Sequence, residues 1–175
     1  MHFEHFSTKD FSMQKFTQKY TIIQLLEPVA VGMQFSSGSW PLHSTVVDTF
    51  AVSWDATEMI TELEAAFKAC KPAHSIAEDD TFFGVEKDVQ VTLLRKTDSL
   101  TNLHHNVLSF LEKGGLILND PQFAREGFLP HATVQKHTRL TKGDEVSFTA
   151  LSIIDMFPDG DAYQRKVLAT IPLGT

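Results

Sequence analysis

Two short stretches of the chain carry the same pattern: "PLHSTV" over residues 41–46 and "LPHATV" over residues 129–134. Each has a proline one or two positions before a histidine, then a small residue, a threonine and a valine. With 8 His and 17 Thr among 175 residues, about one bare His-x-Thr match is expected by chance. The shared flanking residues therefore carry the information. The pair is a coincidence, a repeated structural element, or two halves of one site.

Both stretches lie in segments rich in β-branched and apolar residues, which predicts strands. Side chains alternate between the two faces of a strand, so His43 and Thr45 share one face, as do His131 and Thr133. The small and apolar residues between them suit a side covered by helices. We therefore expect the two His–Thr pairs to face away from the helices and to line one cleft.

Two imidazoles and two hydroxyls can perform a definite chemistry. Two histidines with near-neutral pKa values can serve as base and acid in one turnover, and threonine hydroxyls can donate hydrogen bonds to phosphodiester oxygens. This set suits in-line attack on a cyclic phosphate, or the reverse reaction. It needs no metal ion, because the second imidazole protonates the leaving oxygen. The alternative interpretation is that each Thr is an ordinary strand residue and each His a hydrogen-bonded interior residue.

The remaining pattern predicts an α+β fold with mostly antiparallel sheets, in the order β, β, α, β, β, α, β, β, β. Short turns join the predicted strands, which we expect over residues 20–31, 42–53, 81–85, 89–96, 129–140, 145–157 and 162–173.

Two amphipathic helices are the clearest predicted elements. The first follows Asp55, an N-cap residue that forms a capping-box spacing with Glu58. The second covers residues 97–115, with Asp98 or Ser99 as its N-cap. His104 and His105 are adjacent on this helix and point about 100° apart, so they cannot easily act as a pair. We expect one at the edge of the core and one in solvent.

The chain divides into two similar halves, and each half supplies one helix and one strand that carries the motif. The motif strand precedes the helix in the first half and follows it in the second. We expect one bilobal domain over residues 17–175, with outer helices and a central cleft between two sheets. An N-terminal extension over residues 1–16 precedes it and either packs on the body or stays loose.

Composition limits the classes of partner. The net charge is −7 and no basic stripe is present, which disfavours binding to long nucleic acid. No apolar run approaches the roughly 20 residues that span a bilayer, and the start is no secretory signal. Cys70 is the single cysteine, which favours a reducing, cytoplasmic setting. We expect neither Cys70 with His74 nor His2 with His5 to bind a metal, and we expect no cofactor.

The two motifs carry a family resemblance. "HSTV" at 43–46 and "HATV" at 131–134 match the paired motifs, His-x-Ser/Thr followed by an apolar residue, of the 2H phosphoesterase superfamily. That family includes 2′-5′ RNA ligase-like proteins and cyclic nucleotide phosphodiesterases. The resemblance covers residues 18–173, and the end of the chain is similar to the family's closing hairpin. It implies that His43 and His131 are the catalytic acid/base pair, and that Thr45 and Thr133 bind the phosphate.

Some features depart from the family pattern. Bacterial RNA ligase-like members often carry an Arg near the second motif, whereas the nearest basic residues here are Lys136 and Arg139. The segment after the first motif also differs from the Phe-Leu-Gly type. Aromatic candidates for stacking on a base are Tyr163 and Phe128, with Trp40 as a further one, and the alternative is that each packs in the core or a loop.

We therefore expect a monomeric, metal-independent cyclic phosphodiesterase. Its substrate would be a small nucleotide or RNA end that carries a 2′,3′-cyclic phosphate or a related group. The alternatives are a 2′-5′ RNA ligase-like enzyme, a phosphodiesterase for 2′-5′-linked oligonucleotides or ADP-ribose-type cyclic phosphates, and a nucleotide- or RNA-end-binding module with little catalysis. The intact His and Thr of both motifs favour catalysis.

Overall fold

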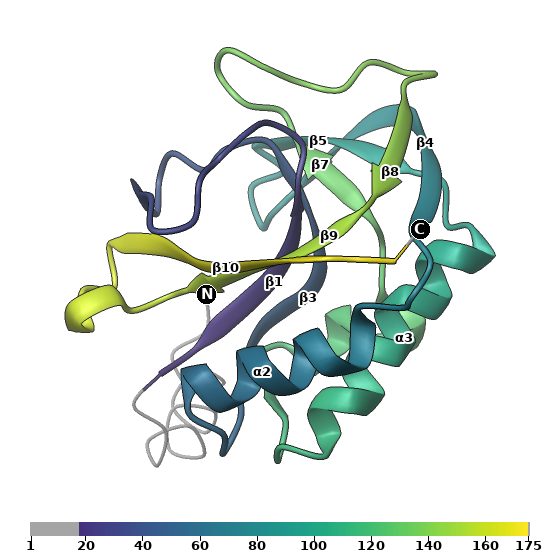
Figure 1. Ribbon diagram of the computed structural model, residues 1–175. Helices are drawn as coiled ribbons and strands as arrows, with labels where there is room; N and C mark the ends of the chain where they lie inside the picture. The colour runs from purple at the N-terminus through teal and green to yellow at the C-terminus, as the bar shows by residue number, and fades with distance from the viewer. Residues whose placement is uncertain (1–17, 175) are drawn as a thin grey trace.

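The computed structural model describes residues 18–174, and the predicted extension over residues 1–16 lies outside them. Two sheets form the body (Figure 1), one with the strand order β2-β10-β9-β1-β3-β6 and one with the order β7-β5-β4-β8. Every strand pairing is antiparallel, which confirms the predicted α+β class. The strands are β1 (Tyr20–Leu25), β2 (Gln34–Ser36), β3 (His43–Ala51), β4 (Ala73–Phe83), β5 (Val89–Leu94), β6 (Ile117–Leu118), β7 (His131–Thr133), β8 (Glu145–Phe148), β9 (Ala150–Asp155) and β10 (Gln164–Pro172).

Helix α2 (Ala56–Phe67) begins where the sequence predicts. The Asp55 carboxylate accepts a hydrogen bond from the Glu58 N–H at 2.8 Å, so Asp55 is the N-cap. Helix α3 (Asp98–Glu112) corrects the prediction, because its N-cap is Thr97. The Thr97 hydroxyl accepts from the Leu100 N–H at 3.3 Å. Ser99 does not cap the helix, because its hydroxyl accepts a hydrogen bond from the backbone N–H of His74, at the start of β4.

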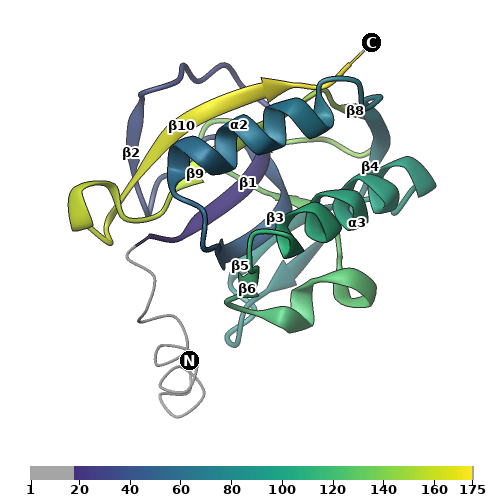
Figure 2. The ribbon, with the colours of Figure 1, turned by 60° about the horizontal axis from the view of Figure 1, so that its bottom comes forward.

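The two helices lie side by side on one side of the sheets (Figure 2). Phe67 of α2 contacts Phe110 of α3 edge to face, with ring centroids 5.7 Å apart. Helix α2 packs on β10, and α3 packs on β3 and β4, so one apolar core joins the helices to both sheets. The side chains that the helices bury are each worth about 1.5–3 kcal/mol when fully removed from water, which holds both helices on this side. A second, smaller apolar cluster is formed by Ile23, Ile154 and Val167.

Several strands differ from the prediction in length. Strand β4 starts at Ala73, earlier than predicted, because its first half buries only small residues and gives a weak apolar pattern. The predicted strand over residues 129–140 is reduced to β7, since the chain turns where the Gln135 N–H bonds to the Thr138 carbonyl. Strands β2 and β6 lie in segments with no strand prediction.

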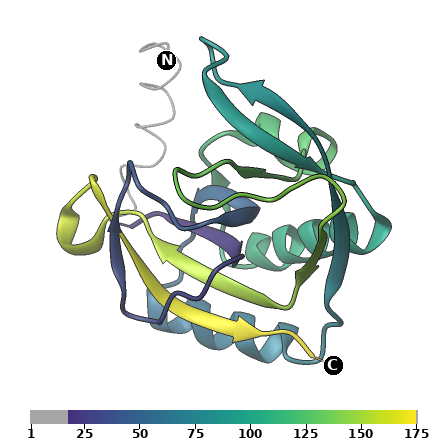
Figure 3. The same ribbon diagram turned by 90° about the horizontal axis from the view of Figure 1, so that it is seen from above.

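The predicted strand over residues 145–157 is two strands in two sheets. Strand β8 pairs with β4, and β9 pairs with β1 and β10, so the chain crosses from one sheet to the other at Thr149. The side-chain oxygen of Gln24, a buried residue of β1, accepts from the N–H groups of Thr149 at 2.7 Å and Ala150 at 3.0 Å. This amide stabilises the crossing, because buried N–H groups need acceptors. Figure 3 shows both sheets with the helices beneath them.

Within residues 18–174, no helix is long and apolar enough to cross a membrane.

Candidate active site

The two motif strands contact each other although they belong to different sheets. Strand β3 begins at His43 and lies inside the larger sheet, and β7 begins at His131 and lies at the edge of the smaller sheet. The charge of protonated His131 contributes to lowering the pKa of His43. The fold thus brings two motif strands from the two halves of the chain into contact.

Each of the two imidazoles is held by a hydrogen bond of the same kind. Nδ1 of His43 lies 2.8 Å from the Pro41 carbonyl oxygen, and Nδ1 of His131 lies 2.8 Å from the Leu129 carbonyl oxygen. A carbonyl oxygen only accepts, so each Nδ1 carries a proton and donates it. The lone pair of each neutral ring is therefore on Nε2. Each histidine is fixed by the backbone two residues before it, which leaves Nε2 for proton transfer.

Aromatic side chains and burial set the protonation of the pair. Trp40 packs on His43 and Phe83 meets His131 edge-on, each with ring centroids 4.8 Å apart. Burial lowers the pKa of His43; the bond to Pro41 partly opposes this, and the charge of His131 adds to it. Burial also lowers the pKa of His131, opposed by its bond to Leu129 and by the negative charge of Asp48. Both pKa values lie below the ordinary value, so at neutral pH the uncharged base is the main form of each ring.

A cavity of about 700 Å³ opens beside the two strands. It includes one residue of each motif pair, Thr45 and His131. His43 lies on the same strand face as Thr45, and Thr133 lies on the same strand face as His131, because side chains alternate along a strand. The other lining residues come from three places, which are strand β3 itself, the β4–β5 hairpin, and the segment before β7: Val46, Asp48, Phe82, Phe83, Gly84, Lys87, Gln122, Phe123, Gly127, Phe128 and Leu129.

His104 links the first motif to the segment that leads into the second. Its Nδ1 donates to the Val46 carbonyl at 2.6 Å, and its Nε2 accepts from the Arg125 N–H at 2.9 Å. Its ring stacks on Phe128 with centroids 3.9 Å apart. Burial lowers the pKa of His104 to about 4, so the ring is neutral as this pair of bonds requires. His105 is exposed as expected, whereas His104 is 1% exposed and belongs to the interior, not its edge.

The predicted stacking residues fall in different places. Phe128 lines the cavity, but it is buried and one ring face is covered by His104. Trp40 is packed against His43. Tyr163 is 78% exposed, lies in the connection between β9 and β10, and does not line the cavity. The exposed aromatic rings at the cavity are instead Phe82 and Phe123, which the sequence pattern did not indicate.

The basic residues after the second motif are directed elsewhere. Arg139 makes two bonds to the Asp80 carboxylate, at 2.7 and 2.8 Å, and these join the loop to β4. Lys136 is exposed and is not in the cavity lining. The basic residue at the cavity is Lys87, in the β4–β5 hairpin. No sequence signal could single it out, because its position depends on the pairing of β4 with β5 and of β5 with β7.

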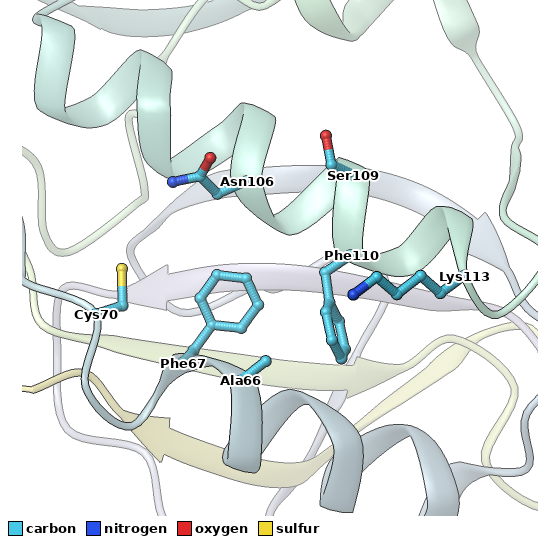
Figure 4. Close-up of a pocket in the computed structure, with 7 residues that line it drawn as sticks. All are labelled: Ala66, Phe67, Cys70, Asn106, Ser109, Phe110 and Lys113. Atoms are coloured by element: carbon cyan, nitrogen blue, oxygen red, sulfur yellow. The ribbon is translucent and has the colours of Figure 1, made fainter.

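A second hollow of about 370 Å³ lies between α2 and α3 (Figure 4). Its lining includes Cys70 but no histidine or carboxylate, so it offers no acid/base pair. Cys70 and His74 have separate partners, the Lys71 carbonyl and the Ser147 hydroxyl. Among residues 18–174, no group of three or more His, Cys, Asp or Glu side chains is placed to hold a metal ion. His2 and His5 lie outside the described residues.

Comparison with known proteins identifies the fold. No family model and no curated protein sequence matches the chain. Solved structures do match: a phosphoesterase and the LigT protein of E. coli in complex with 3′-AMP each have a TM-score of 0.56 at 13% identity, over 90% of this chain and 99% of theirs. The protein TT0787 of Thermus thermophilus matches with a TM-score of 0.54 at 13% identity, over 89% of this chain and 97% of its own. The chain therefore has the fold of the 2H phosphoesterases, which the resemblance of its two motifs predicted.

Proposed function

We propose that this protein is a metal-independent phosphodiesterase that opens the 2′,3′-cyclic phosphate of a small nucleotide. One observation carries the proposal. On two contacting strands, His43 and His131 each donate Nδ1–H to a carbonyl two residues upstream, which leaves two Nε2 atoms for proton transfer. A matched pair of this kind is what in-line opening of a cyclic phosphate needs, because the attacking and leaving oxygens lie on opposite sides of phosphorus.

The proposed reaction uses each group of the two motifs once. One Nε2 accepts a proton from the attacking water, and the other donates a proton to the ester oxygen that leaves phosphorus. The hydroxyls of Thr45 and Thr133 donate hydrogen bonds to the non-bridging oxygens, where negative charge increases in the transition state. Acid–base catalysis of this kind contributes typically about 10² to 10⁴-fold to the rate.

The cavity supports a small nucleotide as the substrate. A volume of about 700 Å³ is in the range for small ligands. Phe82, Phe123 and Leu129 present exposed apolar surface at the cavity, on which a base can stack, and Lys87 supplies positive charge. The LigT structures include complexes with 3′-AMP, ATP and NADP⁺, which are small nucleotides. We extend the proposal to a monomer in the cytoplasm, with a single domain over residues 17–175.

The test is hydrolysis of a panel of nucleoside 2′,3′-cyclic phosphates, with the products followed by ³¹P NMR. We expect His43→Ala and His131→Ala each to lose at least about 100-fold in kcat/KM while circular dichroism stays unchanged. His105→Ala is the matched control, since His105 is an exposed histidine outside the cavity. Near-parent rates in either motif variant would contradict the two-histidine scheme.

The same panel separates the alternatives. We add 2′-5′-linked dinucleotides and an ADP-ribose-type cyclic phosphate. Preferred cleavage of either would replace the proposed substrate and keep the proposed chemistry. Tight binding of cyclic nucleotides without turnover by the parent protein would instead indicate a binding module.

A further inference from the structure

Strand β3 has two irregularities in its pairing with β1, one directly after the first motif and one between Val47 and Phe50. Its pairing with β1 runs from Ile23 opposite Thr45 to Ile22 opposite Val47, so Val46 is an extra residue in the strand. Val46 and its neighbour Val47 are both buried in the same core cluster, whereas consecutive residues of a regular strand point to opposite faces. This is a β-bulge, and a bulge changes the direction of the side chains that follow it.

The bulge turns Asp48 into the cavity. Asp48 is three residues after Thr45, and a regular strand would place these two side chains on opposite faces. After the bulge, both line the same cavity with His131. The Asp48 carboxylate also accepts from the Thr49 N–H at 2.8 Å, which fixes its direction. Asp48 is therefore a half-buried carboxylate held beside one of the two imidazoles.

The charged groups around the cavity affect the pKa values of the two histidines differently. The carboxylate of Asp48 opposes the lowering of the pKa of His131, whereas the pKa of His43 is lowered further by the charge of His131. The other charged groups near Asp48 and His131 are Lys87 of the hairpin, which lines the cavity, and Asp120 before β7, whose charge acts on Asp48. The second motif has no matching carboxylate: the residue five positions after His131 is Lys136, which is exposed beyond the end of β7.

We propose that Asp48 is a positioning residue that makes the two imidazoles unequal, so that His131 holds the proton and acts as the acid while His43 acts as the base. This inference rests on the proposed function. In ring opening, water attacks phosphorus and gives a proton to Nε2 of His43. The bond from phosphorus to one ring oxygen breaks, and that oxygen takes the proton from Nε2 of His131. The product is a phosphate monoester, and a proton returns from His43 to His131 through solvent.

The test is an NMR titration of the histidine Cε1–H signals in the full chain without substrate. We expect Asp48→Asn to lower the pKa of His131 by about half a unit or more, with a smaller or opposite change at His43. Asp48→Glu keeps the charge and should retain most of the parent value. Asp79→Asn is the control, because Asp79 pairs with Lys142 on the surface. An unchanged pKa of His131, or a larger fall at His43, would overturn the proposal.

This titration needs no turnover, so it is independent of whether the protein cleaves cyclic phosphates. Where the parent does turn over, the pH dependence of kcat/KM gives a second measurement. Loss of the acid's proton ends activity at high pH, so Asp48→Asn should move the alkaline limb to lower pH. A variant that loses activity with an unmoved alkaline limb would contradict the assignment of His131 as the acid.

Discussion

Each of the two motif strands positions one His–Thr pair, but the two strands lie in different surroundings. Strand β3 has nine residues, pairs with β1 and β6, and has two register shifts in its pairing with β1. Strand β7 has three residues, lies at a sheet edge and pairs only with β5 among the described strands. The two strands share the bond from Nδ1 to the carbonyl two residues upstream and the alternation that puts His and Thr on one face. This comparison teaches that orienting one His–Thr pair takes only about three residues of strand.

Each motif pairs with one neighbouring strand, but the segment before the second motif has contacts of its own. His43, Ser44 and Thr45 pair with β1, and His131, Ala132 and Thr133 pair with β5. In β7 the preceding segment is held by His104, which bonds to both the first motif and Arg125, and by the close turn at Gly127. A Cβ at Gly127 would lie 1.9 Å from the Gln122 carbonyl oxygen, so only glycine fits there. The second motif is therefore positioned both by its pairing with β5 and by the loop contacts of the segment before it.

The largest expected effect tests whether the two motifs act as one unit. The double variant His43→Ala/His131→Ala should be no more than about 10-fold slower than either single variant, although each single variant loses about 10² to 10⁴-fold. Acid and base operate in the same step, so losing one removes most of the benefit of the other. Single-turnover rates on a cyclic nucleotide measure this. Fully multiplicative losses would mean that the two histidines act in separate steps.

The next effect concerns the support of the second motif. The pKa of His104 is lowered from 6.5 to about 4 by burial, so the unfolded chain takes up a proton at higher pH than the folded protein. The stability contributed by neutral His104 is complete above pH 6.5 and is lost as the pH falls to 4, which amounts to about 3 kcal/mol. Urea unfolding at pH 7 and pH 4.5 measures it. In His104→Gln the fall should be smaller by most of this amount, while His43 and His131, whose pKa values burial also lowers, keep their share of it. An unchanged fall would assign the acid sensitivity to groups other than His104.

A smaller effect compares the two hydroxyls. Thr45→Val and Thr133→Val keep the side-chain shape and remove one hydrogen bond to a charged oxygen, worth about 1.5–3 kcal/mol. Each should lower kcat/KM by about 10 to 100-fold with little change in the melting temperature. Thr170→Val is the control, since Thr170 is an exposed residue of β10 and does not line the cavity. A loss confined to Thr45→Val would show that phosphate is held by the first motif alone.

The smallest expected effect is on the pH optimum. One ring must be neutral and the other protonated, so kcat/KM should follow a bell-shaped curve. Burial lowers the pKa of both rings, which places both limbs, and therefore the maximum, below pH 6.5. Initial rates in overlapping buffers at constant ionic strength measure the profile. A maximum above pH 7.5 would mean that bound substrate or another group controls protonation.

Much of the fold follows from local patterns in the sequence. The Asp55 cap, the apolar stripes of both helices and the closing hairpin of β9 and β10 are all local features, and the structure has each of them. The boundaries that failed depend on distant partners. Residues 145–157 read as one strand because nothing local records that Gln24 accepts from the backbone at Thr149.

The site could be anticipated in part. The four motif residues were identifiable because His-x-Thr spacing and strand alternation are local, and the structure brings their strands into contact. The other cavity residues were not, because Phe82, Lys87 and Phe123 reach the cavity through a hairpin and a loop. The placement of Asp48 has a weak local indication in the sequence. Two consecutive apolar residues, Val46 and Val47, interrupt the alternation of the strand and indicate a bulge before Asp48.

The crossing at Thr149 has a mechanical consequence. One residue joins the last strand of one sheet to a strand of the other, and the Gln24 amide clamps it from inside. The ends of β8 and β9 are therefore tied to β1 at this point. Any movement of one sheet relative to the other there must break the two hydrogen bonds that Gln24 accepts.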